Sequence, residues 1–334
     1  MKELRAAVIG CGWAGRYHAQ AYAQHSQVDL IAVCDVLADR AETLAVHHQC
    51  KAYTSAEEML SQEWLDVVSV ATTTETHFEL VRRCLRAGSA VLCEKPLARD
   101  VQSAESMVRE ASAAQLPLGV NYNRRYAAGY LKAKQWTSRA GRIHYVSAVL
   151  AQNVPLAQTE ELRAKLPRDF LVFDAASHLV DLFRYLVGEP EGLCAHASPQ
   201  DPEAFWTDLS ASLQFDNGAL GTMICSFAGP EWGQLPIERT EIASESERLV
   251  VDNISQAVFL LGYQDHTLRT WRPSIFEPTG YGESMLASIQ AWIEANLKSQ
   301  PPPIDGEDGL CTLRICEQIV NSISGRAFSE RRSM

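Results

Sequence analysis

The chain has 334 residues, of which 46% are hydrophobic and 21% are charged, the composition of a globular protein long enough for two domains. Its formal net charge of -11 at pH 7 implies an acidic surface, which repels phosphate backbones and argues against a nucleic-acid partner. No apolar run approaches the roughly 18 residues of a membrane helix, and no signal peptide is recognisable. We therefore expect a cytoplasmic protein without membrane contact. The nine cysteines are scattered without a C-x-x-C pair, which predicts neither a disulfide framework nor a metal site.

The first part of the chain alternates short apolar runs with amphipathic segments. In chain order we predict strand Ala6–Ile9, helix Trp13–His25, strand Val28–Cys34, helix Asp39–His47, strand Asp66–Ala71, helix Glu75–Ala87, strand Ala90–Cys93, helix Val101–Ala114 and strand Leu116–Val120. Short, nearly continuous apolar strands between helices are typical of a parallel sheet that helices cover on both faces. Residues 1–122 are therefore predicted to form a doubly wound α/β domain of the Rossmann type.

The pattern changes after residue 122. We predict strand Val146–Leu150, helix Ala175–Leu186, strands Leu209–Phe215, Ala219–Phe227 and Glu238–Ala243, and helices Ser284–Leu297 and Leu310–Ser324. Asp216-Asn217-Gly218 lies between two of these strands and is a hairpin signal. Residues 123–334 are therefore predicted to form an α+β domain with a mostly antiparallel, open-faced sheet. An uncovered face would suit a homodimer or a homotetramer.

A glycine-rich segment follows the first predicted strand. Gly10, Gly12 and Gly15 form a G-x-G-x-x-G pattern that opens a predicted helix, and Asp35 lies at the end of the second strand, 20 residues beyond Gly15. This is the full context of a dinucleotide-binding fingerprint, in which backbone amides at a helix N-terminus bind the diphosphate. A carboxylate at Asp35 favours NAD, although NADP stays possible. The alternative is a structural turn without a ligand.

Two further motifs carry chemistry. Lys95, in Glu94-Lys95-Pro96, follows a predicted strand, where it could hold the oxyanion of a hydride-transfer reaction. Asp174 and His178 are four residues apart, so they share a helix face, and the carboxylate could orient the imidazole as a proton acceptor. Taken singly, these residues are better explained as an exposed loop lysine and as an N-cap with a surface or packed histidine.

The motifs occur together in the order of a known family. Besides the glycine pattern, the chain contains Thr72-Thr73-Thr74-x-x-His77, Glu94-Lys95-Pro96-Leu97-Ala98, Arg124-Arg125-Tyr126 and Asp174-x-x-x-His178-x-x-Asp181. Over essentially its whole length the chain resembles the glucose–fructose oxidoreductase, inositol dehydrogenase and MocA (Gfo/Idh/MocA) family. The resemblance implies transfer of a hydride between nicotinamide C4 and a hydroxyl-bearing carbon of a sugar, a sugar derivative or a cyclic polyol.

The resemblance also implies site residues. The catalytic set is Lys95, Asp174 and His178, with His178 as general acid and base, and Asp174 and His178 are expected to meet Lys95 over the nicotinamide. The cofactor-binding residues are Gly10, Gly12, Trp13, Ala14, Gly15, Asp35, Arg40, Thr72, Thr73, His77, Glu94, Lys95 and Arg125.

The sequence departs from the family pattern at several positions, and these departures leave the substrate open. Thr73-Thr74 replaces the usual Pro-Asn, Phe170-Leu171 replaces a frequent Gly-Gly, and Ala127 stands where several members have Asp. Two other functions remain as alternatives: a glycosidase that uses bound NAD for transient oxidation, and an NAD-sensing regulator without catalysis.

Overall fold

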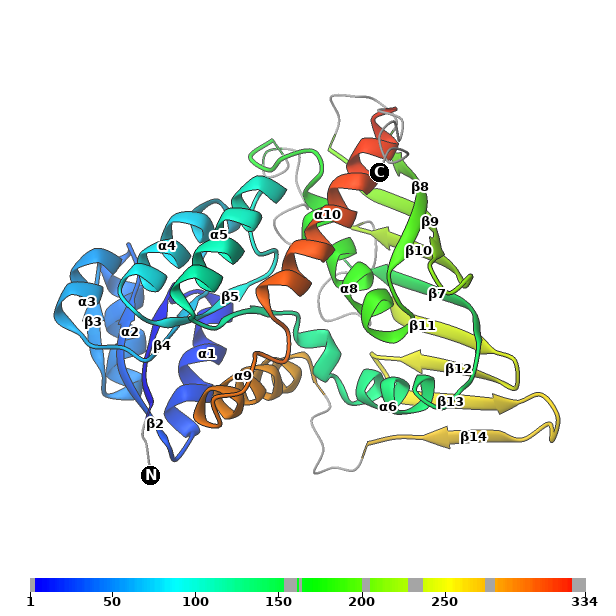
Figure 1. Cartoon of the computed structure of the whole chain (residues 1–334), viewed down its shortest axis with the longest axis horizontal. Coiled ribbons are helices and arrows are strands. Elements are labelled where there is room, and N and C mark those ends of the chain that lie inside the picture. Colours follow the sequence, from blue (N-terminus) through cyan, green and yellow to red (C-terminus); the bar gives the residue numbers. More distant parts are fainter. Residues whose placement is uncertain are drawn as a thin grey trace. The chain divides into compact units, whose positions relative to one another are not determined.

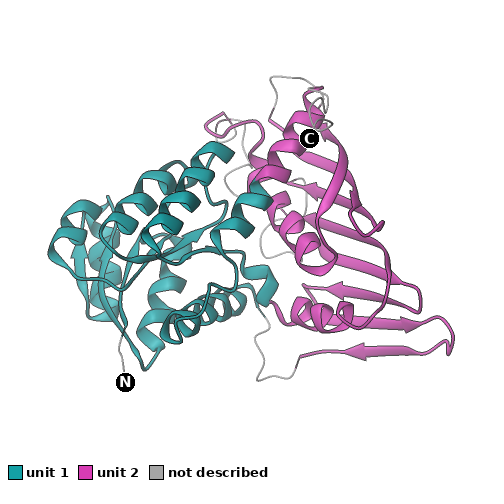
Figure 2. Ribbon diagram, viewed as in Figure 1, with its two compact units in different colours: residues 1–126, 280–313 teal, residues 127–279, 314–334 magenta. Residues whose placement is uncertain are grey.

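The computed structural model describes residues 4–152, 161, 164–199, 205–227, 237–273 and 280–325. The chain forms two compact units (Figure 2): unit 1 contains residues 1–126 and 280–313, and unit 2 contains residues 127–279 and 314–334. This division differs from the sequence-based one, which assigned all residues from 123 onward to the second domain. The reason is helix α9 (Tyr281–Leu297), whose buried Ile289, Trp292 and Ile293 join the hydrophobic core of unit 1.

Unit 1 contains the predicted parallel sheet, with strand order β3-β2-β1-β4-β5-β6 (Figure 1). This is the order of a doubly wound dinucleotide-binding fold. The strands and helices of its first segment are β1 (Leu4–Ile9), α1 (Trp13–Gln24), β2 (Val28–Cys34), α2 (Ala38–His48), β3 (Lys51–Tyr53), α3 (Ala56–Gln62), β4 (Val67–Val70), α4 (Thr74–Arg86), β5 (Ala90–Glu94), α5 (Val101–Ala114), β6 (Leu118–Asn121) and the 3₁₀ turn η1 (Asn123–Tyr126). Strand β3 and helix α3 were not predicted, because a three-residue, largely exposed strand has no detectable hydrophobic period.

Helices cover both faces of this sheet. Every residue of β4 and β5 is buried, which explains why these strands read as continuous apolar runs. On α4 the buried residues His77, Val81, Cys84 and Leu85 form one stripe of the helix, whereas its other residues are half-buried or exposed. Figure 1 shows α4 and α5 over one face and α1 and α9 over the other.

Unit 2 contains an eight-stranded sheet in the order β14-β13-β12-β11-β7-β10-β9-β8, in which only β10 and β7 pair in parallel. Its elements are α6 (Ala128–Thr137), β7 (Ile143–Ala151), the π-helical turn η3 (Val172–Ala176), α8 (Ser177–Leu186), β8 (Pro190–Ser198), β9 (Asp208–Phe215), β10 (Leu220–Ser226), β11 (Ile237–Ser244), β12 (Glu247–Asp252), β13 (Ala257–Gly262) and β14 (Leu268–Trp271). The last helix, α10 (Gly306–Ile323), begins in unit 1 and ends in unit 2. The mostly antiparallel sheet confirms the predicted fold class.

Along β9 every second residue is buried, from Leu209 to Phe215, and the residues between them are exposed. Such alternation is typical of a sheet with one covered face. The helices of unit 2 account for the covered face, since α6 packs against β12 and β13 and α8 packs against β7.

All nine cysteines lie in the described part of the chain, where each has a free thiol. Among the helices that the structure describes, none is both long enough and apolar enough to cross a membrane.

Candidate functional site

The glycine loop connects β1 to α1 at the carboxyl end of the sheet of unit 1. Gly10 has a φ of +99°, and a Cβ atom there would overlap the carbonyl group of Ala71, which follows β4. A Cβ at Gly15 would overlap the carbonyl oxygen of Gly10, so this glycine lets the helix approach the loop closely. Two of the three glycines are therefore required by packing alone.

Gly12 differs from the other two glycines, because a Cβ on it would meet no atom within 4 Å. It is the N-cap of α1, no side chain caps the helix there, and the first turn carries no acidic residue. Amides at an uncapped helix N-terminus attract anions. The loop thus fits the diphosphate of a dinucleotide, with Gly12 leaving open the space that the ligand needs; Ala14, half-buried in the first turn, adds no bulk.

Asp35 connects the two loops that border this space. Its Oδ2 accepts a hydrogen bond of 2.8 Å from the amide of Cys11, and its Oδ1 accepts one of 2.9 Å from the amide of Leu37. Burial and the charge of Asp35 raise the pKa of the Cys11 thiol to about 12, while the charge of the exposed Arg40 acts in the opposite sense. The Asp35 carboxylate therefore holds the glycine loop in addition to the role toward the ribose that the sequence suggests.

Aromatic side chains surround the start of α1. The ring of Trp13, which is 50% exposed, lies 5.0 Å from that of Tyr17 and 5.3 Å from that of Tyr281. The guanidinium of Arg124 lies 5.4 Å above the ring of Tyr281. Trp13 is thus a half-exposed aromatic surface directly beside the amides of the glycine loop. Nothing in the sequence indicated that Tyr281 and Arg124, which are remote from Trp13 along the chain, lie near it.

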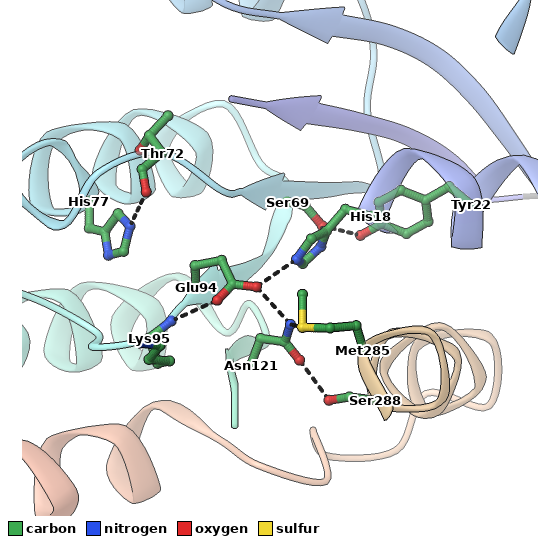
Figure 3. Close-up of polar contacts among 10 residues, drawn as sticks. All are labelled: His18, Tyr22, Ser69, Thr72, His77, Glu94, Lys95, Asn121, Met285 and Ser288. Atoms are coloured by element: carbon green, nitrogen blue, oxygen red, sulfur yellow. Dashed lines mark hydrogen bonds and ion pairs between the residues drawn. The ribbon is translucent and has the colours of Figure 1, made fainter. Parts of the chain in front are cut away.

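The turn after β4 and the turn after β5 meet at His77. Its Nδ1 lies 2.9 Å from the carbonyl oxygen of Pro96 and its Nε2 lies 3.2 Å from that of Thr72, as Figure 3 shows for Thr72. Burial, against the opposing effect of these carbonyls, lowers the pKa of His77, so the ring is neutral at pH 7. The imidazole is fully buried and joins the two turns. Thr73, the N-cap of α4, is exposed and Thr72 is half-buried.

Glu94 is the last residue of β5 and lies at the centre of a buried polar cluster (Figure 3). Its Oε1 contacts Nε2 of His18 at 3.0 Å and accepts a hydrogen bond of 2.7 Å from Nδ2 of Asn121. Its Oε2 accepts a hydrogen bond of 3.2 Å from the amide of Lys95. Burial alone would raise the pKa of Glu94, but His18, Asn121 and the charge of Lys95 outweigh it and lower that pKa. The carboxylate is therefore ionised at neutral pH, and the backbone amide of Lys95 lies directly beside it.

Arg125, expected near the cofactor, is buried in η1. Its guanidinium approaches the carboxylate of Asp308 on α10 at 3.4 Å. On the same helix Gly309 lies close to Val120 and Leu97, leaving no room for a Cβ atom. The pair therefore ties η1 to the first turn of α10 within unit 1.

The remaining two candidates lie in unit 2. Asp174 is the third residue of η3, and His178 is the second residue of α8 and is only 3% exposed. The predicted helix Ala175–Leu186 would place Asp174 at a helix start. In the structure Asp174 lies inside a helical run instead, because that run already begins at residue 170. A π-helical turn is often found at functional sites, and residues four apart still complete about one turn in it.

The sequence-based site lacked His18 and Asn121, whose side chains contact the Glu94 carboxylate. A signal for His18 was present, since it lies on the same face of α1 as Gly15, Ala19 and Tyr22, and a buried imidazole requires partners. Asn121 could be found only from the pairing of β5 with β6, in which it is the register partner of Glu94.

Known proteins resemble this chain along its whole length. Residues 4–122 match a family model described as "Oxidoreductase family, NAD-binding Rossmann fold", and residues 130–247 match "GFO/IDH/MocA C-terminal domain". UDP-N-acetylglucosamine 3-dehydrogenase of Acidithiobacillus ferrooxidans is 30% identical over 345 residues, which cover 99% of this chain and 100% of the relative. Myo-inositol 2-dehydrogenase of Thermotoga maritima is 28% identical over 349 residues, which cover 99% of this chain and 98% of the relative. Levoglucosan dehydrogenase, solved with NADH and levoglucosan, has the same fold, with a TM-score of 0.87, 20% identity and 98% coverage of both chains.

Proposed function

This chain belongs to the GFO/IDH/MocA family of NAD-binding oxidoreductases, and from that premise we propose that it oxidises or reduces a sugar, a sugar derivative or a cyclic polyol at a hydroxyl-bearing carbon. The observation that carries the proposal is that unit 1 combines two features. Helix α1 starts at Gly12 without a side-chain cap, and Lys95 lies at the carboxyl end of β5. Ligands of doubly wound sheets bind at that end of the strands. The named relatives support the substrate class, since one acts on a cyclic polyol and one on a sugar nucleotide.

NAD supplies the nicotinamide ring that accepts the hydride when an alcohol is oxidised. In the proposed reaction the ammonium group of Lys95 binds the substrate oxygen, which becomes more negative as its proton leaves. The neutral imidazole of His178 takes that proton, and Asp174 stabilises the resulting charge. The products are a carbonyl compound, NADH and a protonated histidine. Asp35 disfavours the 2′-phosphate of NADP, because two negative charges would come together there.

The purified full chain should be incubated with NAD or NADP and a panel of inositols, sugars, sugar acids and sugar nucleotides, while the absorbance of the reduced nicotinamide is followed. We expect NADH formation with at least one compound and a preference for NAD. Lys95→Ala should lower turnover by about 1000-fold, while NADH binding stays measurable. The exposed Lys298 offers a control, since Lys298→Ala should behave like wild type. Wild-type turnover in Lys95→Ala would refute the proposed site.

We also propose that two or four copies assemble through the uncovered face of the unit 2 sheet. Tyr145, Leu220, Ile224 and Ile237 are between 36% and 59% exposed and lie on the neighbouring strands β7, β10 and β11. Tyr145 and Leu220 are register partners, so their side chains adjoin on one face. A cluster of exposed apolar residues on central strands favours contact with a second copy. Sedimentation at several concentrations tests the assembly.

The cytoplasm is the compartment we propose. Support comes from the nine free thiols, which suit a reducing environment. Fractionation of cells that produce the chain, followed by detection with an antibody, tests this location.

A further inference from the structure

The polar cluster around Glu94 continues through His18 to Ser69 and Tyr22, which are completely buried in unit 1 (Figure 3). Nδ1 of His18 lies 2.8 Å from Oγ of Ser69, and the hydroxyl of Tyr22 lies 2.8 Å from the same oxygen. On the other side, Ser288 donates a hydrogen bond of 2.7 Å to Oδ1 of Asn121. The cluster therefore joins three strands, β4, β5 and β6, to the helices α1 and α9.

The positions of the protons follow from the chemistry of the groups. The ionised Glu94 can only accept, so Nε2 of His18 carries the proton between them. Nδ1 of His18 shares a hydrogen bond with the hydroxyl of Ser69, which shares another with the hydroxyl of Tyr22. The imidazole is thus held at both ring nitrogens, and together with Asn121 it holds Oε1 of Glu94 in place.

The cluster is not suited to moving protons to solvent. Tyr22 forms its inner end, is completely buried, and has a pKa that burial raises to about 12. A chain of hydrogen bonds that ends in the core cannot exchange protons with water. What it can do is hold its other end, the Glu94 carboxylate, in one place.

We propose that His18 is a positioning residue for Lys95. By fixing the carboxylate of Glu94, His18 places the oxygen that accepts a hydrogen bond from the amide of Lys95. It thereby fixes the backbone position from which the Lys95 side chain extends. Misplacement of a reacting group by about 1 Å can cost on the order of 100-fold in rate. The contacts that support this role of His18 lie within unit 1, and only the expected effect on turnover rests on the proposed function.

The first test is hydrogen exchange of the Lys95 amide, measured in the full chain with residue resolution. In His18→Phe, which keeps a ring but no donor, we expect exchange of this amide to be about 10-fold faster. His18→Gln restores a donor and should return the rate to within about 3-fold of wild type. If His18→Phe does not fold, Ser69→Ala keeps the imidazole but frees its orientation, and should accelerate the same amide.

Ser89→Ala is the matched control. Ser89 lies just before the other end of β5, is buried, and donates one hydrogen bond of 2.8 Å to the carbonyl of Leu65. Its loss removes a buried hydrogen bond without touching Glu94, so the Lys95 amide should exchange as in wild type. Unchanged exchange at Lys95 in a folded His18→Phe, or equal acceleration in Ser89→Ala, would overturn the proposal.

The second test separates positioning from general stability by kinetics. With the best substrate of the panel, His18→Phe should lower kcat by about 10- to 100-fold, while KM and the Kd for NADH change by less than about 3-fold. His18→Gln should recover most of kcat. If no compound of the panel is oxidised by wild type, the proposed function fails, yet the exchange experiment still decides the role of His18.

Discussion

The two sheets of this protein bury their strands to different extents. In unit 1 every residue of β4 and β5 is buried, whereas in unit 2 the residues of β9 alternate between buried and exposed. A strand buried on both faces leaves no position without packing neighbours, so polar groups there must be satisfied by one another. The cluster around Glu94 is such a case. The half-exposed sheet of unit 2 instead presents apolar side chains that none of the described elements of unit 2 covers.

The largest loss of stability is expected in the tightly packed unit 1, when Gly15 is replaced by alanine. The Cβ atom in Gly15→Ala would overlap the carbonyl oxygen of Gly10, so the variant should lose about 3 kcal/mol of unfolding free energy and bind NADH at least about 100-fold more weakly. Gly12→Ala, whose Cβ meets no protein atom, should keep its stability within about 1 kcal/mol but bind NADH about 10-fold more weakly. Denaturant unfolding and fluorescence titration measure both. Equal stability of the two variants would contradict the packing argument.

A smaller effect is expected at Asp35. In Asp35→Ala the amides of Cys11 and Leu37 lose their acceptor, which should cost about 2 kcal/mol of stability and about 10-fold in NADH affinity. Discrimination against NADPH should also weaken. Asp29 is an exposed carboxylate on β2, the strand that Asp35 follows, and provides the control, since Asp29→Ala should leave both quantities near wild type. Calorimetry with NADH and NADPH checks this; an unchanged affinity would show that the loop does not depend on Asp35.

Acid should destabilise unit 1 through His77. Burial lowers the pKa of His77 below the usual histidine value of 6.5, so near that pH the unfolded chain binds a proton that the folded chain does not. Stability is therefore complete above pH 6.5 and falls as the pH decreases toward the folded pKa, by about 1 kcal/mol per pH unit at most. His77→Gln should show a flatter profile in this range, and the exposed His144 gives the control variant His144→Gln. Parallel profiles of His77→Gln and wild type would exclude His77 as the cause.

The smallest effect on folding is expected on the uncovered face of unit 2. Leu220 and Ile224 are 59% and 50% exposed, so the double variant Leu220→Lys and Ile224→Lys should change the unfolding free energy by less than about 0.5 kcal/mol per site. If this face joins two copies, the same variant should sediment as a smaller species than wild type. Substitution of Leu268 by Lys, on the edge strand β14, serves as a control for added charge. Unchanged sedimentation would place the contact elsewhere.

Local patterns determined much of the fold and part of the site. Continuous apolar strands predicted the parallel sheet of unit 1, and the glycines with Asp35 predicted the binding loop, because each of these features depends on neighbours in the sequence. The sequence did not predict strands β3, β8, β12, β13 and β14 or helices α3 and α6. Burial along β3, β12, β13 and β14 does not alternate from residue to residue, so these strands lack a strand period. Asp174 was expected at a helix start, but the chain is already helical from residue 170.

The sequence by itself determined which residue types were available: a glycine loop for an anion, a lysine after β5, and an aspartate and a histidine four residues apart. Only the tertiary structure decided that α9, from near the end of the chain, completes the core of unit 1. It also decided that His18, Ser69 and Asn121 surround Glu94, although they lie on three different elements. The physical reason is that a buried carboxylate needs several donors at once, and donors from α1 and β6 reach one point only when the sheet has formed.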